Sequence, residues 1–128
     1  MVGLVVVSHS QKAAEGICDI AAQMGGSDAR IEPAGGDPDG GIGTSVDRIE
    51  DAIDAADDGD GVVVLVDLGS AVMNAEVAME MGDATVRIAD APILEGALNA
   101  AVEASGSKAT LDSVVESAEE AREYRKLN

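Results

Sequence analysis

The N-terminal stretch MVGLVVVSHS (residues 1–10) joins a continuous apolar run to a short polar turn. Val2 to Val7 is rich in β-branched residues, which is typical of a strand buried on both faces. His9, the only histidine of the chain, follows this run directly. Apolar residues at helical spacing begin just after it. The stretch therefore predicts a buried strand that delivers one imidazole to the start of a helix.

Strand-like and helix-like segments alternate along the rest of the chain. Gly25 and Gly26 are expected to end the first helix. Further strands are expected over 29–34, 61–66 and 84–89, with Pro33 marking the end of the first of these. Further helices are expected after the candidate caps Thr44, Ser70 and Thr110, and after Pro92. This alternation predicts an α/β fold, with a parallel sheet and helices on both faces.

If the first strand is central, with the second and third on either side of it, three loops meet at the carboxyl ends of the strands, where parallel sheets place their sites. They hold His9, the Gly-rich segment 35–43 and the turn 67–70. An imidazole can act as base, ligand or nucleophile, and amides at a helix start favour a phosphate, so phosphoryl transfer to a histidine nitrogen suits this place. Asp67 could orient the ring, and the hydroxyl groups that could contact phosphate are those of Ser8, Ser10, Thr44 and Ser45.

Simpler interpretations of the same residues remain open. His9 could be an ordinary polar loop residue, and Asp67 a carboxylate satisfied by the amides of a helix start. The Gly-rich segment lacks the Lys of a Walker A loop and does not match GxGxxG, so it is equally well explained as a flexible connection. There is no GxSxG motif of a serine hydrolase.

Acidic residues dominate the charge, with 25 Asp and Glu against 8 Lys and Arg and a net charge of −17. This argues against nucleic acid and anionic membranes as partners. Because about 1 M salt shortens the Debye length to about 3 Å, we expect a salt-rich cytoplasm, as in a halophile; an ordinary acidic protein is the alternative. The lone Cys18 excludes an internal disulfide and, with one histidine, a Cys/His zinc site. The first apolar run is too short to span a membrane, so we expect a cytoplasmic protein.

Helix 71–81 carries apolar residues over most of its circumference. A helix of this kind is buried on two sides. Either a partner subunit covers one of them, or the helix has a wide face in the core.

Four segments together resemble a known family: MVGLVVVSHSQKAAEGICDIAAQM (1–24), GGIGTSVDRIEDAI (40–53), VVVLVDLGSAVMNAEVAME (62–80) and ADAPILEGALNAAVEA (89–104). In this order they are similar to the DhaM-type phosphotransferase subunits of dihydroxyacetone kinase. The resemblance implies the fold of mannose-class enzyme IIA, a four-stranded parallel sheet of order 2-1-3-4, in a homodimer. It covers nearly all of the chain, which we expect to be one domain over 1–128 that takes phosphate from a separate protein.

The resemblance also implies a role for the turn residues. His9 would accept phosphate, through Nε2, from HPr and pass it to ADP held on the kinase subunit, which phosphorylates dihydroxyacetone bound on a third subunit. Asp67 would orient the ring through Nδ1, and Gly69 and Ser70 match the turn beside it as further phosphate contacts. No metal or cofactor is implied. The alternatives are a mannose-class sugar transporter component and a non-enzymatic regulatory module of the same fold.

Overall fold

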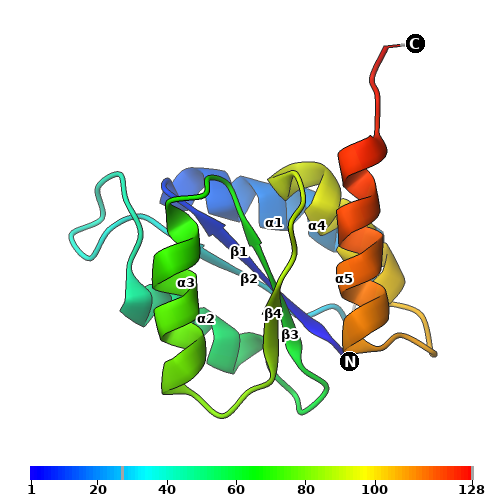
Figure 1. Ribbon diagram of the computed structural model, residues 1–128, viewed down its shortest axis with the longest axis horizontal. Coiled ribbons are helices and arrows are strands. Elements are labelled where there is room, and N and C mark those ends of the chain that lie inside the picture. The colour runs from blue at the N-terminus through cyan, green and yellow to red at the C-terminus, as the bar shows by residue number, and fades with distance from the viewer. Residues whose placement is uncertain (27, 128) are drawn as a thin grey trace.

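The structure is a computed structural model that describes residues 1–26 and 28–127 (Figure 1). Its elements are, in chain order, β1 (Gly3–Ser8), α1 (Gln11–Gly25), β2 (Ile31–Gly35), α2 (Val46–Ala56), β3 (Val62–Val66), α3 (Ala71–Met81), β4 (Val86–Ile88), α4 (Ile93–Ala104), α5 (Leu111–Glu120) and the 3₁₀ turn η1 (Ala121–Glu123). All strand pairs are parallel, in the order β2-β1-β3-β4. The predicted fold and strand order are confirmed.

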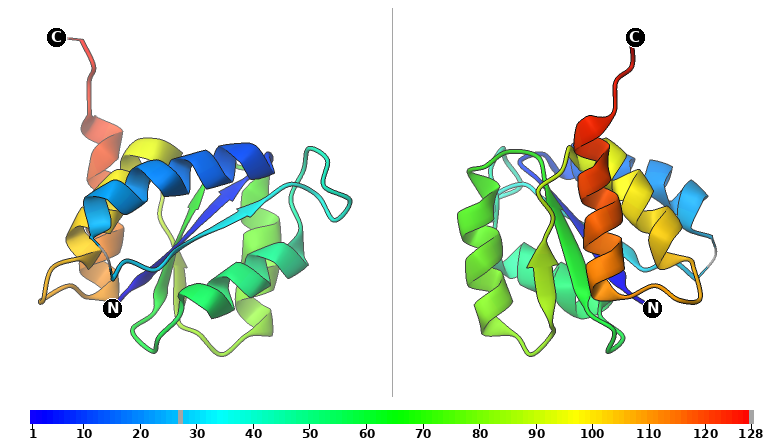
Figure 2. Two further views of the ribbon diagram at one scale, coloured as in Figure 1. Left: turned by 180° about the vertical axis from the view of Figure 1, so that it is seen from behind. Right: turned by 45° about the vertical axis from the view of Figure 1, so that its right-hand side comes forward.

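The two central strands supply both halves of the core. Because side chains alternate along a strand, Leu4 and Val6 of β1 pack with α1, α4 and α5, while Val5 and Val7 pack with α2 and α3. Figures 1 and 2 show these helices as layers on opposite faces of the sheet. Both central strands are thus anchored on two sides, which fixes the position of the loops at their carboxyl ends.

β2 lies at one edge of the sheet, and Pro33 lies inside it. The Arg30 carbonyl accepts from the Leu4 amide at 2.8 Å, and the Gly36 amide donates to the Ser8 carbonyl at 3.3 Å, so the even-numbered residues face β1. Pro33 therefore faces outward, where a missing N–H breaks no bond with β1. The prediction that Pro33 ends the strand is wrong because the strand is an edge strand.

The outward groups of Gly35 at the end of β2 are also occupied. Its amide donates to Gln11 Oε1 at 3.0 Å, and its carbonyl accepts from Arg48 Nη1 at 3.0 Å. A Cβ on Gly35 would lie 2.6 Å from the Ser10 carbonyl oxygen, so only glycine allows β2 to approach the start of α1 this closely.

The helix caps agree with the sequence in part. The Thr110 hydroxyl accepts from the Ser113 amide at 3.1 Å and caps α5, as predicted; the two residues also form a capping box. The cap predicted at Thr44 lies one residue later, where the Ser45 hydroxyl accepts from the Arg48 amide at 3.3 Å. Thr44 is thereby free for a different contact.

α3 buries only a stripe of alanines, Ala71, Ala75 and Ala78. Its large side chains Met73 and Met81 are 74% and 55% exposed, so a wide core face is not the explanation for them. A partner subunit on this helix stays a prediction. Among the helices of residues 1–26 and 28–127, none is long and apolar enough to cross a membrane.

Candidate functional site

His9 and Asp67 lie side by side because β1 and β3 are neighbouring strands in register. Val7 pairs with Val66, and the Asp67 amide donates to the Val7 carbonyl at 3.1 Å. The residues that directly follow the two strands, His9 after β1 and Asp67 after β3, then turn into the same space. His9 Nδ1 lies 3.0 Å from Asp67 Oδ1, and His9 Nε2 lies 3.0 Å from the hydroxyl of Ser70 at the start of α3.

The Asp67 carboxylate also holds the backbone around the ring. Its Oδ2 accepts from the Ser8 hydroxyl and from the His9 amide, both at 2.9 Å. Partial burial acts to raise the pKa of Asp67, but the hydrogen bonds from His9 and Ser8 outweigh it and hold the pKa below its ordinary value. Asp67 is therefore ionised at neutral pH and acts only as an acceptor.

This charge state decides which ring nitrogen carries the hydrogen of the neutral imidazole. An ionised carboxylate cannot donate, so the hydrogen of the neutral imidazole must be on Nδ1. Nε2 then keeps its lone pair and accepts from the Ser70 hydroxyl. The His9 side chain is 24% exposed, so Nε2 lies near the surface. The line Asp67–His9–Ser70 is thus arranged for a nucleophilic imidazole nitrogen.

The other predicted phosphate contacts have different neighbours. Ser8 is 2% exposed, and its hydroxyl is bound to Asp67. The Ser10 hydroxyl caps α1 by accepting from the Ala13 amide at 3.2 Å. The Gly69 carbonyl accepts from the Val72 amide at 3.1 Å. Ser70 stands at the start of α3, as predicted, but its side chain makes no cap hydrogen bond and faces His9 instead.

Asn74 is a residue of this region that the sequence analysis missed. Its side-chain amide donates to the Thr44 hydroxyl at 2.7 Å, which ties the Gly-rich loop to α3. The backbone amide of Gly43, the residue before Thr44, donates to the His9 carbonyl at 2.9 Å. Asn74 follows Ser70 by four residues and so shares its helix face, which is the signal that could have identified it.

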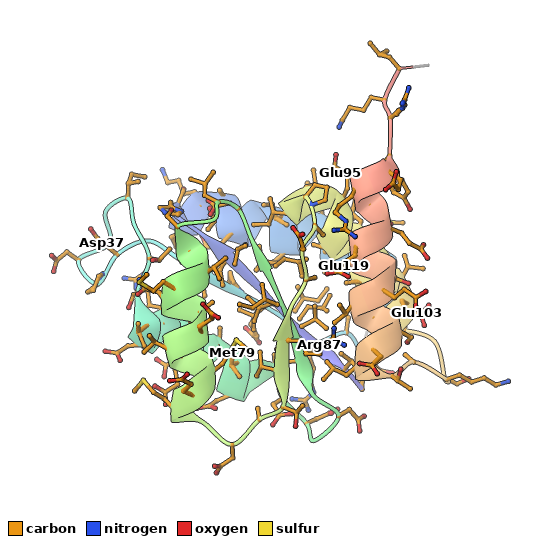
Figure 3. The ribbon with its side chains drawn as sticks, viewed as in Figure 1. Asp37, Met79, Arg87, Glu95, Glu103 and Glu119 are labelled. Atoms are coloured by element: carbon orange, nitrogen blue, oxygen red, sulfur yellow. The ribbon has the colours of Figure 1, made fainter. Side chains whose placement is uncertain are left out.

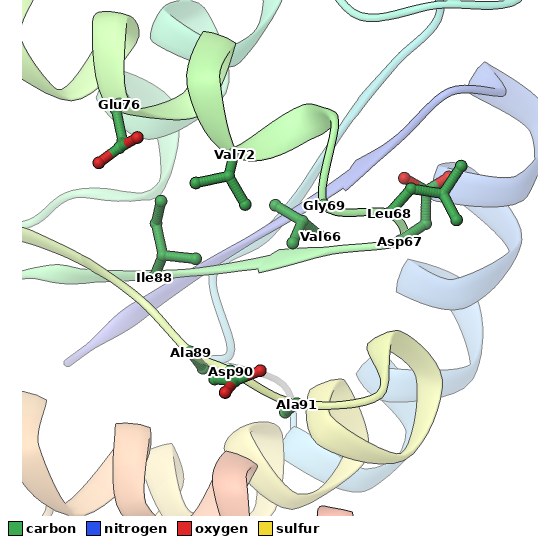
Figure 4. Close-up of a pocket in the computed structure, with 10 residues that line it drawn as sticks. All are labelled: Val66, Asp67, Leu68, Gly69, Val72, Glu76, Ile88, Ala89, Asp90 and Ala91. Carbon is green, nitrogen blue, oxygen red and sulfur yellow. The ribbon is translucent and has the colours of Figure 1, made fainter.

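A cavity of about 470 Å³ opens beside the site, between α3 and the ends of β3 and β4 (Figure 4). Val66, Val72 and Ile88 form its apolar wall, with Glu76 and Asp90 at its sides. Asp67 lines the cavity and His9 does not. In the part of the chain that the structure describes, no group of His, Cys, Asp and Glu is placed to hold a metal ion.

Comparison with known proteins identifies the relatives of this chain. The family model EIIA-man, described as the PTS system fructose IIA component, matches residues 3–115. The DhaM phosphoryl donor subunit of PEP-dependent dihydroxyacetone kinase from Escherichia coli K12 is 41% identical over 98% of this chain. Subunit DhaM of the second such kinase of Listeria innocua is 38% identical over 80% of this chain and 86% of its own length. The chain spans only 28% of the Escherichia coli protein.

Solved structures agree with these sequence matches. A crystal structure of a protein of unknown function has a TM-score of 0.83 and 30% identity, covering 99% of this chain and 98% of its own. The phosphotransferase system component EIIA from Streptococcus agalactiae has a TM-score of 0.69 and 16% identity, covering 94% of this chain and 92% of its own, and so shares the fold. With a family model over most of its length and close relatives of one type, the chain belongs to the EIIA-man family and is of the DhaM type.

Proposed function

We propose that this protein is a phosphohistidine carrier in dihydroxyacetone phosphorylation, with His9 as the carrier residue. The observation that supports this most directly is the geometry at His9, where Asp67 holds the proton on Nδ1 and leaves Nε2 with a lone pair. The names of its relatives, which are phosphoryl donor subunits, support transfer of phosphate from this chain to the kinase.

In the first step, Nε2 attacks the phosphorus of a phosphohistidine on HPr. The nitrogen–phosphorus bond of the donor breaks as a new one forms at Nε2, and the electron pair of the broken bond returns to the donor ring. The Nδ1 proton stays in place, so the phosphorylated ring carries a positive charge that the Asp67 carboxylate stabilises. The Ser70 hydroxyl, which donates to Nε2 in the resting protein, turns to donate to a phosphate oxygen.

In the second step, a β-phosphate oxygen of ADP on the kinase subunit attacks the same phosphorus. The nitrogen–phosphorus bond breaks, ATP forms, and the electron pair returns to Nε2. The starts of α1 and α3 both lie at this site, and the partial positive charge of a helix N-terminus favours the phosphate while it is held here. The carrier therefore needs no nucleotide or metal of its own.

The same geometry would serve a mannose-class sugar transporter component, and the acceptor distinguishes the two. The protein is labelled with radioactive phosphoenolpyruvate, enzyme I and HPr, and then mixed with the ADP-loaded kinase subunit. We expect an acid-labile, base-stable label that moves to ATP. Because His9 is the only histidine, the label must be lost in His9→Ala. Label that persists in this variant, or the absence of any label in wild type, as a regulatory module predicts, would contradict the proposal.

A homodimer is part of this proposal. The exposed Met73, Val77 and Met81 of α3 support it, because they form an apolar stripe on a helix whose opposite face is already in the core. Sedimentation of the wild-type protein measures the oligomeric state.

A further inference from the structure

Lys12 is a cation at an unfavourable position in its helix. It lies in the first turn of α1, three residues after His9, and its side chain is exposed. The N-terminus of a helix carries a partial positive charge, which repels a lysine and attracts a carboxylate. α2, α4 and α5 each have a carboxylate in the first turn, from Asp47, Glu95 and Asp112. α1 and α3, the two helices that begin beside His9 (Figure 1), have none, so their positive ends stay uncompensated and Lys12 adds to one of them.

Lys12 also makes no side-chain contact with a polar group in the part of the chain that the structure describes. Five of the eight Lys and Arg residues do make one: Arg30, Arg48, Arg87, Arg122 and Lys126. Figure 3 shows one of them, Arg87, on β4 beside α5, which supplies its partner Asp112. The other two without such a contact among the described residues, Lys108 and Arg125, lie in the loop after α4 and in the C-terminal segment.

The loops that meet at His9 supply carboxylates and no cation. The segments 36–47 and 66–81, which hold the Gly-rich loop, the turn after β3 and α3, contain no Lys or Arg. Figure 3 shows one of their carboxylates, that of Asp37, on the projecting loop. The next residue of the chain, Arg48, is held by the Gly35 carbonyl at the outer edge of β2. The cation that follows His9 most closely and has no other contact in the described residues is therefore Lys12.

The two steps of the proposed function differ in their need for such a cation, and the inference rests on that function. In the first step a neutral imidazole nitrogen attacks phosphorus. In the second step an oxygen of the ADP diphosphate attacks the phosphoryl group on His9, so two anions must come into contact. Their repulsion grows as the two proteins exclude water from the site.

We propose that Lys12 is a catalytic residue of the second step, in which its ammonium group binds the diphosphate oxygens of the acceptor nucleotide. The lysine stays protonated and transfers no proton. Its charge offsets the repulsion between the diphosphate and the phosphoryl group while the bond from Nε2 to phosphorus breaks. This role accounts for a cation that weakens the helix start in the free protein.

The test replaces Lys12 with Gln and, as a matched control, Lys108 with Gln. Lys108 is exposed in the loop between α4 and α5, at the far end of the molecule from His9 (Figure 1), so both variants lose one positive charge. Each protein is labelled on His9 by HPr, and a saturating amount of ADP-loaded kinase subunit is then added. Rapid quench gives the rate of each step, and the melting temperature is measured on the free proteins. Lys12→Arg tests whether another cation serves.

We expect Lys12→Gln to slow transfer to ADP about tenfold or more while labelling by HPr changes less than about twofold, and we expect Lys12→Arg to restore most of the transfer. The melting temperature of Lys12→Gln should lie about 1–4 °C above that of Lys108→Gln, because the start of α1 loses a repelled charge. A role in folding alone does not predict a slower reaction in a more stable protein.

Transfer to ADP at the wild-type rate in Lys12→Gln would overturn the role of Lys12 and leave the proposed function intact. A loss of equal size in both steps, with a lower melting temperature than that of the control, would assign Lys12 a structural role and so overturn it too. Wild-type protein that is labelled on His9 but forms no ATP with the kinase subunit would overturn both the role of Lys12 and the proposed function.

Discussion

Replacing Asp67 with Asn keeps the shape of the side chain and removes its charge. Asp67 accepts one hydrogen bond from His9 Nδ1 and two more from Ser8 and the His9 amide. An amide has one accepting and one donating end, so it cannot serve all of these donors. With its NH₂ group toward Nδ1, the Asn side chain would favour the tautomer of His9 that carries its hydrogen on Nε2. In that tautomer Nε2 has no lone pair with which to attack phosphorus.

The size of the effect follows from the contact between Asp67 and His9. A hydrogen bond to a charged group contributes about 1.5–3 kcal/mol net. The two side chains are 24% and 22% exposed, so solvent screens their attraction only in part, and the upper half of that range applies. A loss of about 2–3 kcal/mol from the transition state slows phosphorylation of His9 by about 30- to 150-fold.

Rapid-quench measurement of label transfer from HPr gives this rate, and the ¹⁵N spectrum of the single histidine reports its tautomer. Asp83→Asn, which neutralises an exposed carboxylate in the loop after α3, is the matched control for net charge. A wild-type rate in Asp67→Asn, with the hydrogen still on Nδ1, would refute the role given to this carboxylate.

Three further predictions concern stability. The pKa of Asp67 is lowered from 3.8 in the folded protein, so its carboxylate stabilises the fold above about pH 4 and loses this contribution as the pH falls through the folded pKa. In urea titrations, the difference in unfolding free energy between wild type and Asp67→Asn should therefore disappear in acid. A difference that does not change with pH would be inconsistent with this. Gly35→Ala should lower the free energy of unfolding by about 1–3 kcal/mol, because the added Cβ would lie 2.6 Å from backbone atoms of Ser10 and Gln11. Gly16→Ala, in the same helix as Gln11 with open space around it, should instead raise the free energy of unfolding by about 0.5–1 kcal/mol. A stability change of the same sign in both variants would argue against the close approach of β2 to α1 at Gly35. Finally, the melting temperature should rise between dilute buffer and about 1 M salt, because the net charge of −17 is then screened; an unchanged value would argue against adaptation to salt.

The arrangement of the sheet could largely be predicted from the sequence. The apolar run before His9 and its repeat over 61–66 predict buried central strands, and the structure confirms them as β1 and β3. If these two strands are neighbours, His9 and Asp67 meet, because neighbouring parallel strands end at the same edge of the sheet. The strand order itself came from the resemblance to a family, since periodicity does not say which strands are neighbours.

The errors have a common cause in tertiary contacts that no local pattern encodes. Pro33 predicts the end of a strand, but whether a strand tolerates a proline depends on which of its edges pairs with a neighbour, and β2 pairs only with β1. Thr44 and Ser45 are both good helix caps, and the choice between them depends on Asn74, which is distant in sequence and occupies the Thr44 hydroxyl. The functional roles of His9, Asp67 and Ser70 remain predictions for the experiments above.

The partly occupied outer edge of β2 bears on how this protein resists aggregation. A free strand edge is a template on which other chains aggregate. At β2, Pro33 offers no donor, and Gln11 and Arg48 already hold both backbone groups of Gly35. A strand from another molecule therefore finds no donor at Pro33 and no free backbone group at Gly35, which limits the addition of a strand along this part of β2.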